Sequence, residues 1–306
     1  MRKAFTLIEL IITMVILSIV AYVASGLIAK TYIGYNQTNS INRANLKVEL
    51  AISEIANRLE YAISNTIIKR KDTITNKIFP INAAPTDYGI LEWIGYDKDS
   101  FEASTPPGWS AFCDIKQSAQ SFIITPGSNL NIADSTIKNL SATKASLSLP
   151  NKVAIFFPGN YSYKNIGFFG INLPFIPGES TSGTTLVLNY FNGIAPYYLT
   201  SKLIVNNPSK RIVEQYKLAW SAYAVVPNNC KTGDNNEKIC DLELRYNYRP
   251  WNNEDYTQAE SSLLVNNVTV FKTYATQNRI HIKLCIEDKY LGGKTISICK
   301  EKVVYR

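Results

Sequence analysis

Five cysteines carry the most specific side-chain chemistry in this 306-residue chain, because cysteine pairs form disulfides or bind metals. They are Cys113, Cys230, Cys240, Cys285 and Cys299. Cys230 and Cys240 flank a short polar loop and form a natural disulfide pair. Zinc is disfavoured because the chain has no C-x-x-C pair and a single histidine. Cys113 is left over, either as a buried thiol, which we favour, or as an intermolecular link.

The last 30 residues predict a second disulfide from strand register. Polar and apolar residues alternate along one segment, a double glycine supplies a turn, and a second strand-like segment follows. Pairing the two segments about the glycines places Cys285 opposite Cys299 and Lys283 opposite Glu301. We therefore predict a Cys285–Cys299 disulfide across a terminal hairpin.

Catalytic chemistry finds little support in the sequence. His281 lies on the polar face of the first hairpin strand beside two cations, which suits a solvated side chain better than a general base. The sequence has no second histidine, nucleophile elbow or glycine-rich phosphate loop. The loop from Asp234 to Asp241 could supply oxygen ligands to calcium, but its spacing is not that of an EF-hand and we favour a solvated turn. We expect a non-enzymatic protein that uses no cofactor.

Glu9 stands at the edge of an apolar run long enough to cross a membrane. Residues 10–29 are uncharged, and 20 helical residues span about 30 Å, the thickness of a bilayer core. Arg2 and Lys3 precede the run, so the positive-inside rule leaves the N-terminus in the cytoplasm and Lys30 onward outside. A carboxylate in this position is costly, which indicates a partner. A secretory signal peptide or a plain signal anchor leaves Glu9 unexplained.

The nine residues Ala4-Phe5-Thr6-Leu7-Ile8-Glu9-Leu10-Ile11-Ile12 resemble the N-terminal motif of type IV prepilins and type II secretion pseudopilins. The resemblance implies that a prepilin peptidase cleaves between Ala4 and Phe5 and that Phe5 is then N-methylated. It also implies that Glu9 compensates the charged amino terminus of a neighbouring subunit during filament assembly, which a low-dielectric medium favours. Ala4 replaces the glycine that most often precedes the cleavage site, and Gly26 stands where many major pilins have proline.

A helical pattern continues beyond the membrane segment. Proline is absent before Pro80, and apolar residues recur at intervals of three, four or seven as far as Ile67, with charged residues between them. This predicts helix from Phe5 to about Ile68, on the order of 95 Å long if uninterrupted. The Asn-rich stretch 36–42 is a candidate weak point. We expect the apolar stripe to dock on the C-terminal domain, because three heptads are few for a free coiled coil.

The rest of the chain reads as one antiparallel, β-rich domain, which makes the fold class α+β. Short runs rich in β-branched and aromatic residues alternate with turn residues. Residues 101–149 look like insertions or long loops. We expect a leader at 1–4, a transmembrane helix at 5–29, an amphipathic helix outside the cytoplasm at 30–68, and the globular domain at 69–306. The expected strands cover residues 121–125, 153–157, 184–190, 211–216, 223–226, 242–246, 278–286 and 294–304.

The formal charge of +8 raises the alternative of an anionic partner such as DNA or a membrane surface. One basic cluster is Lys69-Arg70-Lys71. Aromatic residues accompany arginines in the segment 245–251, a combination that can grip single strands. Such residues are also ordinary constituents of a β domain, and we favour that structural interpretation.

Size and layout suggest a large minor subunit within the resembled family. The segments 48–50, 58–62 and 263–271 are similar to W-type minor pilins and J-type pseudopilins. The resemblance implies a single-pass inner-membrane protein with its domain in the periplasm and later at a filament tip. There it would help to initiate or cap assembly with other pilins or pseudopilins, for a pilus, type II secretion or DNA uptake. The alternative is a tip module that contacts DNA or a surface.

Overall fold

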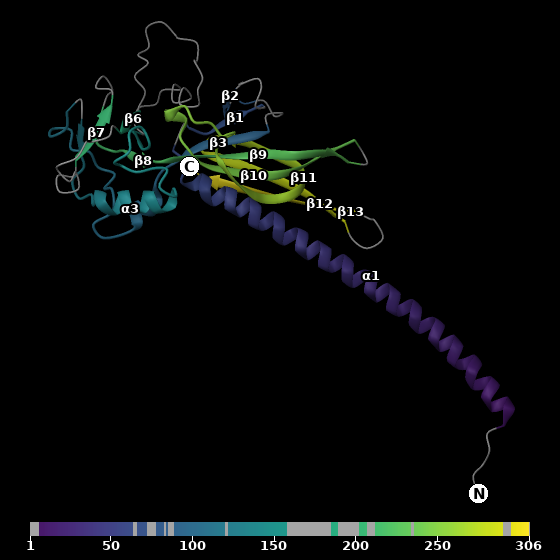
Figure 1. Cartoon of the computed structure of the whole chain (residues 1–306). Helices are drawn as coiled ribbons and strands as arrows, with labels where there is room; N and C mark the ends of the chain where they lie inside the picture. The colour runs from purple at the N-terminus through teal and green to yellow at the C-terminus, as the bar shows by residue number, and fades with distance from the viewer. Residues whose placement is uncertain are drawn as a thin grey trace.

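The computed structural model describes residues 6–63, 66–71, 78–82, 84, 89–119, 122–157, 185–188, 202–206, 212–233, 236–289 and 295–305. Its architecture is α+β, as predicted: one long N-terminal helix leads into a β-rich antiparallel domain (Figure 1). The helices are α1 (Leu7–Glu60), α2 (Lys98–Glu102) and α3 (Leu130–Leu140), and Pro250–Asn252 forms a short 3-10 helix.

Two sheets make up the domain. An eight-stranded sheet has the order β13-β12-β11-β10-β9-β3-β1-β2, and a five-stranded sheet has the order β4-β7-β6-β5-β8. Only Trp220 separates the end of β8 from the start of β9, so the chain passes directly from the second sheet into the first. The strands are β1 (Ile68–Arg70), β2 (Ile78–Pro80), β3 (Ile90–Gly95), β4 (Phe122–Ile124), β5 (Ala154–Phe156), β6 (Thr185–Leu188), β7 (Lys202–Asn206), β8 (Lys217–Ala219), β9 (Ser221–Thr232), β10 (Lys238–Tyr248), β11 (Glu260–Thr276), β12 (Arg279–Lys289) and β13 (Thr295–Tyr305).

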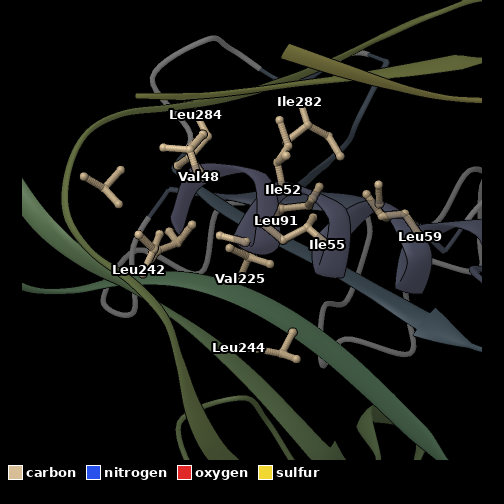
Figure 2. Packing of buried hydrophobic residues seen from close by; sticks show 14 of the residues in the cluster. Val48, Ile52, Ile55, Leu59, Leu91, Val225, Leu242, Leu244, Ile282 and Leu284 are labelled. Carbon is tan, nitrogen blue, oxygen red and sulfur yellow. The ribbon is translucent and has the colours of Figure 1, made fainter. Parts of the chain in front are cut away.

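The helix α1 has two different surroundings along its length. Its first half leaves the domain as an exposed rod, whereas the half from Ser40 onward packs on the larger sheet (Figure 1). The buried side chains recur with helical spacing and meet residues from β3, β9, β10 and β12 in one hydrophobic core (Figure 2). The predicted docking face of the helix is therefore the face that packs. It consists of Ser40, Ala44, Val48, Ala51, Ile52, Ile55, Ala56 and Leu59.

The helix ends at Glu60, eight residues before the expected end near Ile68. The chain turns at Tyr61, Ala62 pairs with Gly95, and the Ile63 amide donates to the carbonyl of Ile94 at 2.8 Å. Ile63 and Ile67, which continue the apolar pattern in the sequence, lie beyond the helix and are buried in the cores of the domain. A buried strand residue and a buried helix residue give the same signal over so short a run.

The Asn-rich stretch does not interrupt α1, and neither does Gly26. Asn36 donates through its side chain to the carbonyl of Tyr32 at 2.9 Å, and Thr38 donates to Gly34 at 3.0 Å. These side chains share the carbonyls that accept the helical N–H bonds, and the helix continues through the stretch.

The larger sheet is strongly curled. Lys69 on β1 donates to the carbonyl of Thr273 on β11 at 3.1 Å, although β3, β9 and β10 lie between these strands in the sheet. Four strand spacings in a flat sheet would separate the two by about 19 Å. The curl brings Ile67 and Ile81, from the β1 side, into the same core as α1.

Several expected boundaries differ from the structure. The segment expected to be loops at 101–149 contains β4, α3 and much of a second core, which includes Trp109, Cys113 and Ile123. The strand expected at 211–216 is displaced along the chain, because the observed strand β8 starts at Lys217. The 17-residue strand β11 was not predicted as a strand, because its exposed Ser and Asn residues mask the alternation.

Candidate functional site

The N-terminus of α1 is fixed by a reciprocal pair of contacts between Thr6 and Glu9. The Glu9 carboxylate oxygen Oε2 accepts from the Thr6 amide at 2.9 Å and from the Thr6 hydroxyl at 2.8 Å. The Glu9 amide donates in return to Thr6 Oγ1 at 3.4 Å. This is a capping box, which satisfies amide groups that the first turn of a helix leaves without partners.

Thr6 is a residue of this candidate site that the sequence analysis missed. The signal was present, since Thr6-Leu7-Ile8-Glu9 has the S/T-x-x-E pattern of a capping box before an apolar run. The other carboxylate oxygen, Oε1 of Glu9, accepts no hydrogen bond from the part of the chain that the structure describes. Glu9 therefore caps its own helix and still offers one oxygen to a further donor.

The first half of α1 is apolar and uncovered. Over its N-terminal part the helix is apolar and long enough to cross a membrane, and the domain buries none of that segment. The hydroxyls of Thr13, Ser18 and Ser25 donate to carbonyls three residues earlier at 2.8–2.9 Å. These three hydroxyls are thus satisfied within the helix, as a bilayer requires.

Residues 1–24 match the prokaryotic N-terminal methylation motif. This prepilin motif indicates a type IV pilin-like or pseudopilin protein, and with the apolar helix it fits an inner-membrane-anchored pilin. It implies processing by a prepilin peptidase and assembly with other pilins. No curated protein and no solved structure matches the chain.

The predicted cleavage and methylation residues, Ala4 and Phe5, lie outside the described residues. Glu9 itself is described and lies in the first turn of the helix that begins at Leu7. Thr6 would be the second residue of a processed chain, so its amide would remain available to Glu9 after cleavage. The capping box is therefore compatible with both the precursor and the processed form.

Ion pairs fasten the second half of α1 of this pilin-like chain to the last two strands. Lys300 on β13 pairs with Glu49 at 2.6 Å, and this hydrogen bond lowers the pKa of Glu49. Asp288 on β12 lies 3.4 Å from Arg43 and 4.0 Å from Lys47. These partly exposed contacts flank the apolar docking face and add to the packing that orients the helix on the sheet.

The structure contains both disulfides that the sequence predicts. Cys285 pairs with Cys299, with 4.0 Å between the Cα atoms, and Cys230 pairs with Cys240 at the same separation. The hairpin has the predicted register, with Lys283 opposite Glu301. Cys113 is a buried free thiol, and burial raises its pKa.

His281 is half-buried rather than fully solvated. Its ring stacks on that of Tyr274 with centroids 4.5 Å apart, and its Nδ1 lies 3.2 Å from a carboxylate oxygen of Glu301. The hydroxyl of Thr276 lies 3.0 Å from the other ring nitrogen, Nε2. With both nitrogens occupied, the ring serves as a cross-strand contact of the sheet.

The arginine and aromatic cluster of segment 245–251 is not an open surface. Arg249 is almost completely buried and bonds to Glu254 at 2.8 Å, while Arg245 pairs with Glu243 at 2.5 Å. The ring of Tyr248 is buried, and Trp251 packs on Phe156 within a core. These side chains hold the domain together, which agrees with the structural interpretation.

A buried charged network also replaces part of the expected basic surface at Lys69-Arg70-Lys71. Arg70 on β1 donates to Glu92 on β3 at 2.9 Å, and Tyr248 donates to the other oxygen of Glu92 at 2.8 Å. All three side chains are buried. Burial raises the pKa of Glu92, while Arg70 and Tyr248 oppose that effect. Sequence alone gave no sign that these cations face inward.

The candidate calcium loop is only partly described, since Asp234 and Asn235 lie outside the described residues. Within the described part, Asp241 accepts from Asn229 at 3.2 Å. No group of three or more His, Cys, Asp or Glu side chains in the described ranges is placed to hold a metal ion.

Proposed function

We propose that the chain is a non-enzymatic minor pilin or pseudopilin that helps to initiate or cap a type IV pilus-like filament. The observation that carries the proposal is a prepilin motif on a 54-residue helix whose apolar half its own domain leaves uncovered. An uncovered apolar helix needs a bilayer or other helices around it. The chain would enter the inner membrane first and the filament afterwards.

In this proposal residues 1–4 form the leader, 5–29 the transmembrane and assembly helix, and the remainder the extracytoplasmic part. Prepilin peptidase would cut between Ala4 and Phe5, and Phe5 would be methylated. The domain would lie in the periplasm, where disulfides such as those at Cys230–Cys240 and Cys285–Cys299 persist. A globular part of well over 200 residues favours a minor subunit of the W or J type over a major one.

Glu9 would act in assembly through the carboxylate oxygen that its capping box leaves open. The free amino terminus of a neighbouring subunit is a cation that could approach this oxygen, and a low dielectric strengthens such an attraction. Removal of the carboxylate would leave a buried cation without its partner, which is strongly unfavourable.

The test replaces Glu9→Leu and uses Thr6→Val as the matched control. Both variants lose the capping box, but only the first loses the carboxylate. We expect both proteins to insert and to be cleaved, and only the Glu9→Leu protein to be missing from sheared filaments. Immunoblots of membrane and filament fractions measure this. Normal incorporation of Glu9→Leu would refute the assembly role.

A second candidate function is a tip module that binds DNA, and the face of β11–β13 turned away from α1 favours it. Lys272 lies directly opposite Lys283 in the sheet, and Arg279 lies on the same face, over the ring of Tyr305 at 5.1 Å. No carboxylate among the described residues forms an ion pair with these three cations. Glu301 lies opposite Lys283 on the neighbouring strand β13, with its carboxylate 3.2 Å from His281, so one carboxylate faces this group of cations. The positive charge that remains supports an anionic ligand.

Salt-dependent binding of the detergent-solubilised full chain to single- and double-stranded DNA tests this candidate. Lys272→Glu with Lys283→Glu should abolish binding, whereas Lys231→Glu with Lys238→Glu, at the other disulfide, should preserve it. Absence of any shift at low salt would remove DNA as a ligand.

A further inference from the structure

A groove of about 370 Å³ lies at the edge of the five-stranded sheet, which is within the range of about 300–1,000 Å³ that small-molecule sites occupy. Two segments line it, residues 110–112 and 215–217, and the second of them leads into the edge strand β8. This sheet lies beyond the C-terminal end of α1, away from the apolar half of the helix (Figure 1). The groove is therefore at the end of the chain that is remote from the membrane segment.

Backbone hydrogen bonds hold the two lining segments side by side. The Cys113 amide donates to the carbonyl of Glu214 at 2.7 Å, and the Tyr216 amide donates to the carbonyl of Ala111 at 3.1 Å. Ala111 has a φ of +58°, a left-handed conformation that residues other than glycine seldom adopt. Such a conformation persists only where its surroundings impose it, and it is frequent at ligand sites.

The pairing of the two segments brings an aromatic ring, an amide and a cation together. Phe112 lies directly opposite Gln215, so their side chains share a face, and Lys217, two residues further on, belongs to the same face. All three line the groove. Phe112 is 46% exposed, and the Gln215 side chain forms no hydrogen bond within the described ranges. Apolar and hydrogen-bonding groups are thus both open to a ligand.

Lys217 lacks a counter-charge. It is half-buried, and its amine lies 4.2 Å from the centroid of the Tyr96 ring. No carboxylate in the described part of the chain pairs with it, Glu214 included, and burial lowers its pKa. An anion in the groove would restore the favourable interactions that this amine has lost with water. One cation matches one negative charge, whereas a nucleic acid backbone calls for several cations along a track.

We propose that the groove binds a sugar residue that carries a carboxylate, as part of an acidic glycan. Lys217 would pair with the carboxylate, and the Gln215 amide, which is both a donor and an acceptor, would bond to sugar hydroxyls. The ring of Phe112 would pack on the apolar C–H face of the sugar. The groove is complete within one chain, so this binding does not depend on filament assembly.

Two other ligand classes match the groove less well. A neutral sugar would leave Lys217 without a counter-charge. An acidic peptide would supply the charge, but its carboxylate side chain has neither the hydroxyls that suit Gln215 nor the flat C–H face that suits Phe112. Uronic acids of polysaccharides and sialic acids of cell-surface glycans share the proposed chemistry, and the test separates these two sources.

The test measures binding of the detergent-solubilised full chain by titration calorimetry and saturation-transfer NMR. One arm compares trigalacturonic acid with its methyl ester, which keeps the hydroxyls and removes the charge. The other arm compares sialyllactose with lactose. We expect an acidic sugar in at least one arm to bind about tenfold or more tightly than its neutral counterpart. The arm that shows this difference identifies the source.

Variants then locate the binding in the groove. Lys217→Met and Phe112→Ala should each lower the affinity about tenfold or more, whereas Phe112→Tyr should retain it. Lys202→Met is the matched control, because Lys202 also stands over an aromatic ring of the same sheet, 3.8 Å from the centroid of Phe122, but does not line the groove. It should leave the affinity unchanged. An unchanged thermal midpoint shows that the variants fold.

Several results would overturn the proposal. They are equal binding of acid and neutral sugar in both arms, absence of binding by either acidic sugar, and a loss with Lys202→Met as large as with Lys217→Met. Tighter binding of a glutamate-rich peptide than of both acidic sugars would also overturn it. The comparison of sugars uses the unaltered chain, so it decides the question even if a variant does not fold. Filament assembly is tested separately by Glu9→Leu.

Discussion

Cys285 lies directly opposite Cys299 in the ladder between β12 and β13, with a disulfide between them and 4.0 Å between their Cα atoms. β13 is an edge strand of the eight-stranded sheet, so it pairs with β12 on one side and with no strand of the sheet on the other. The same edge strand carries Lys300, which holds Glu49 of α1. The disulfide therefore secures a strand on which the long helix rests.

Loss of this disulfide should destabilise the domain. Cys285→Ser with Cys299→Ser is expected to lower the free energy of unfolding by about 2–4 kcal/mol, because the open chain gains conformational entropy when unfolded. Urea denaturation of the detergent-solubilised chain measures the change. The matched variant, Cys230→Ser with Cys240→Ser, removes a disulfide that closes a loop of similar length away from α1. Equal protease sensitivity of α1 in the two variants would contradict a special role for the terminal pair.

The buried Arg70–Glu92 pair should show strong coupling. Arg70→Met or Glu92→Gln alone removes the opposite charge from the remaining buried group and is expected to cost about 3–5 kcal/mol. The double variant should cost much less than the sum of the two. A double-mutant cycle from denaturation midpoints measures the coupling. Additive losses would mean that the two side chains act independently.

Stability should fall as the pH rises through the titration of Asp97. Burial raises the pKa of this carboxyl from its ordinary 3.8 to about 6. Between about pH 4 and pH 6 the folded chain thus holds a proton that the unfolded chain has lost, so the contribution of Asp97 to stability is full below about pH 4, decreases up to about pH 6 and is level above it. The decrease is on the order of 3 kcal/mol.

Asp97→Asn isolates this effect from the titration of other carboxyls. The amide oxygen can still accept from the Ser100 amide, which Asp97 contacts at 3.2 Å as the N-cap of α2. The difference in unfolding free energy between the two proteins, measured from pH 4 to pH 7, should grow in favour of the variant. A difference independent of pH would contradict a titrating Asp97.

Truncating a side chain should lower the stability of the chain strongly on the buried side of α1 and hardly at all on its exposed side. Ile55 is completely buried on the sheet, and Ile55→Ala is expected to cost about 2–5 kcal/mol through lost contacts and a cavity. Leu50 is exposed, so Leu50→Ala should change the stability of the isolated chain by less than about 0.5 kcal/mol. Thermal unfolding of the two variants in detergent provides the comparison. A large loss for Leu50→Ala would mean that this side chain is already covered.

The elements with long, regular patterns were predictable from the sequence. The period of the apolar stripe from Val48 to Leu59 identified the packing face of α1, and strict alternation with a double glycine identified the hairpin and its register. In both cases local spacing and tertiary packing demand the same residues.

Other features depend on partners that are distant in the chain. The helix stops at Glu60 because residues from Ala62 onward pair with β3, about thirty residues later. Arg70 faces inward because Glu92 and Tyr248 meet it there, and no local pattern announces such a network. At the candidate site, the resemblance of residues 4–12 led to Glu9. The contacts of Thr6 followed a local signal that had been overlooked.

Because α1 is continuous from Leu7 to Glu60, it connects its apolar N-terminal part rigidly to the domain. Between the end of the apolar run at Ala29 and the first buried docking residue, Ser40, the helix rises about 17 Å. With no hinge in that stretch, the domain would be held at a set height above the membrane surface. A displacement or rotation of the lower end would reach the sheet undiminished, so that extraction of the subunit from the bilayer would lift and turn its domain in the same stroke.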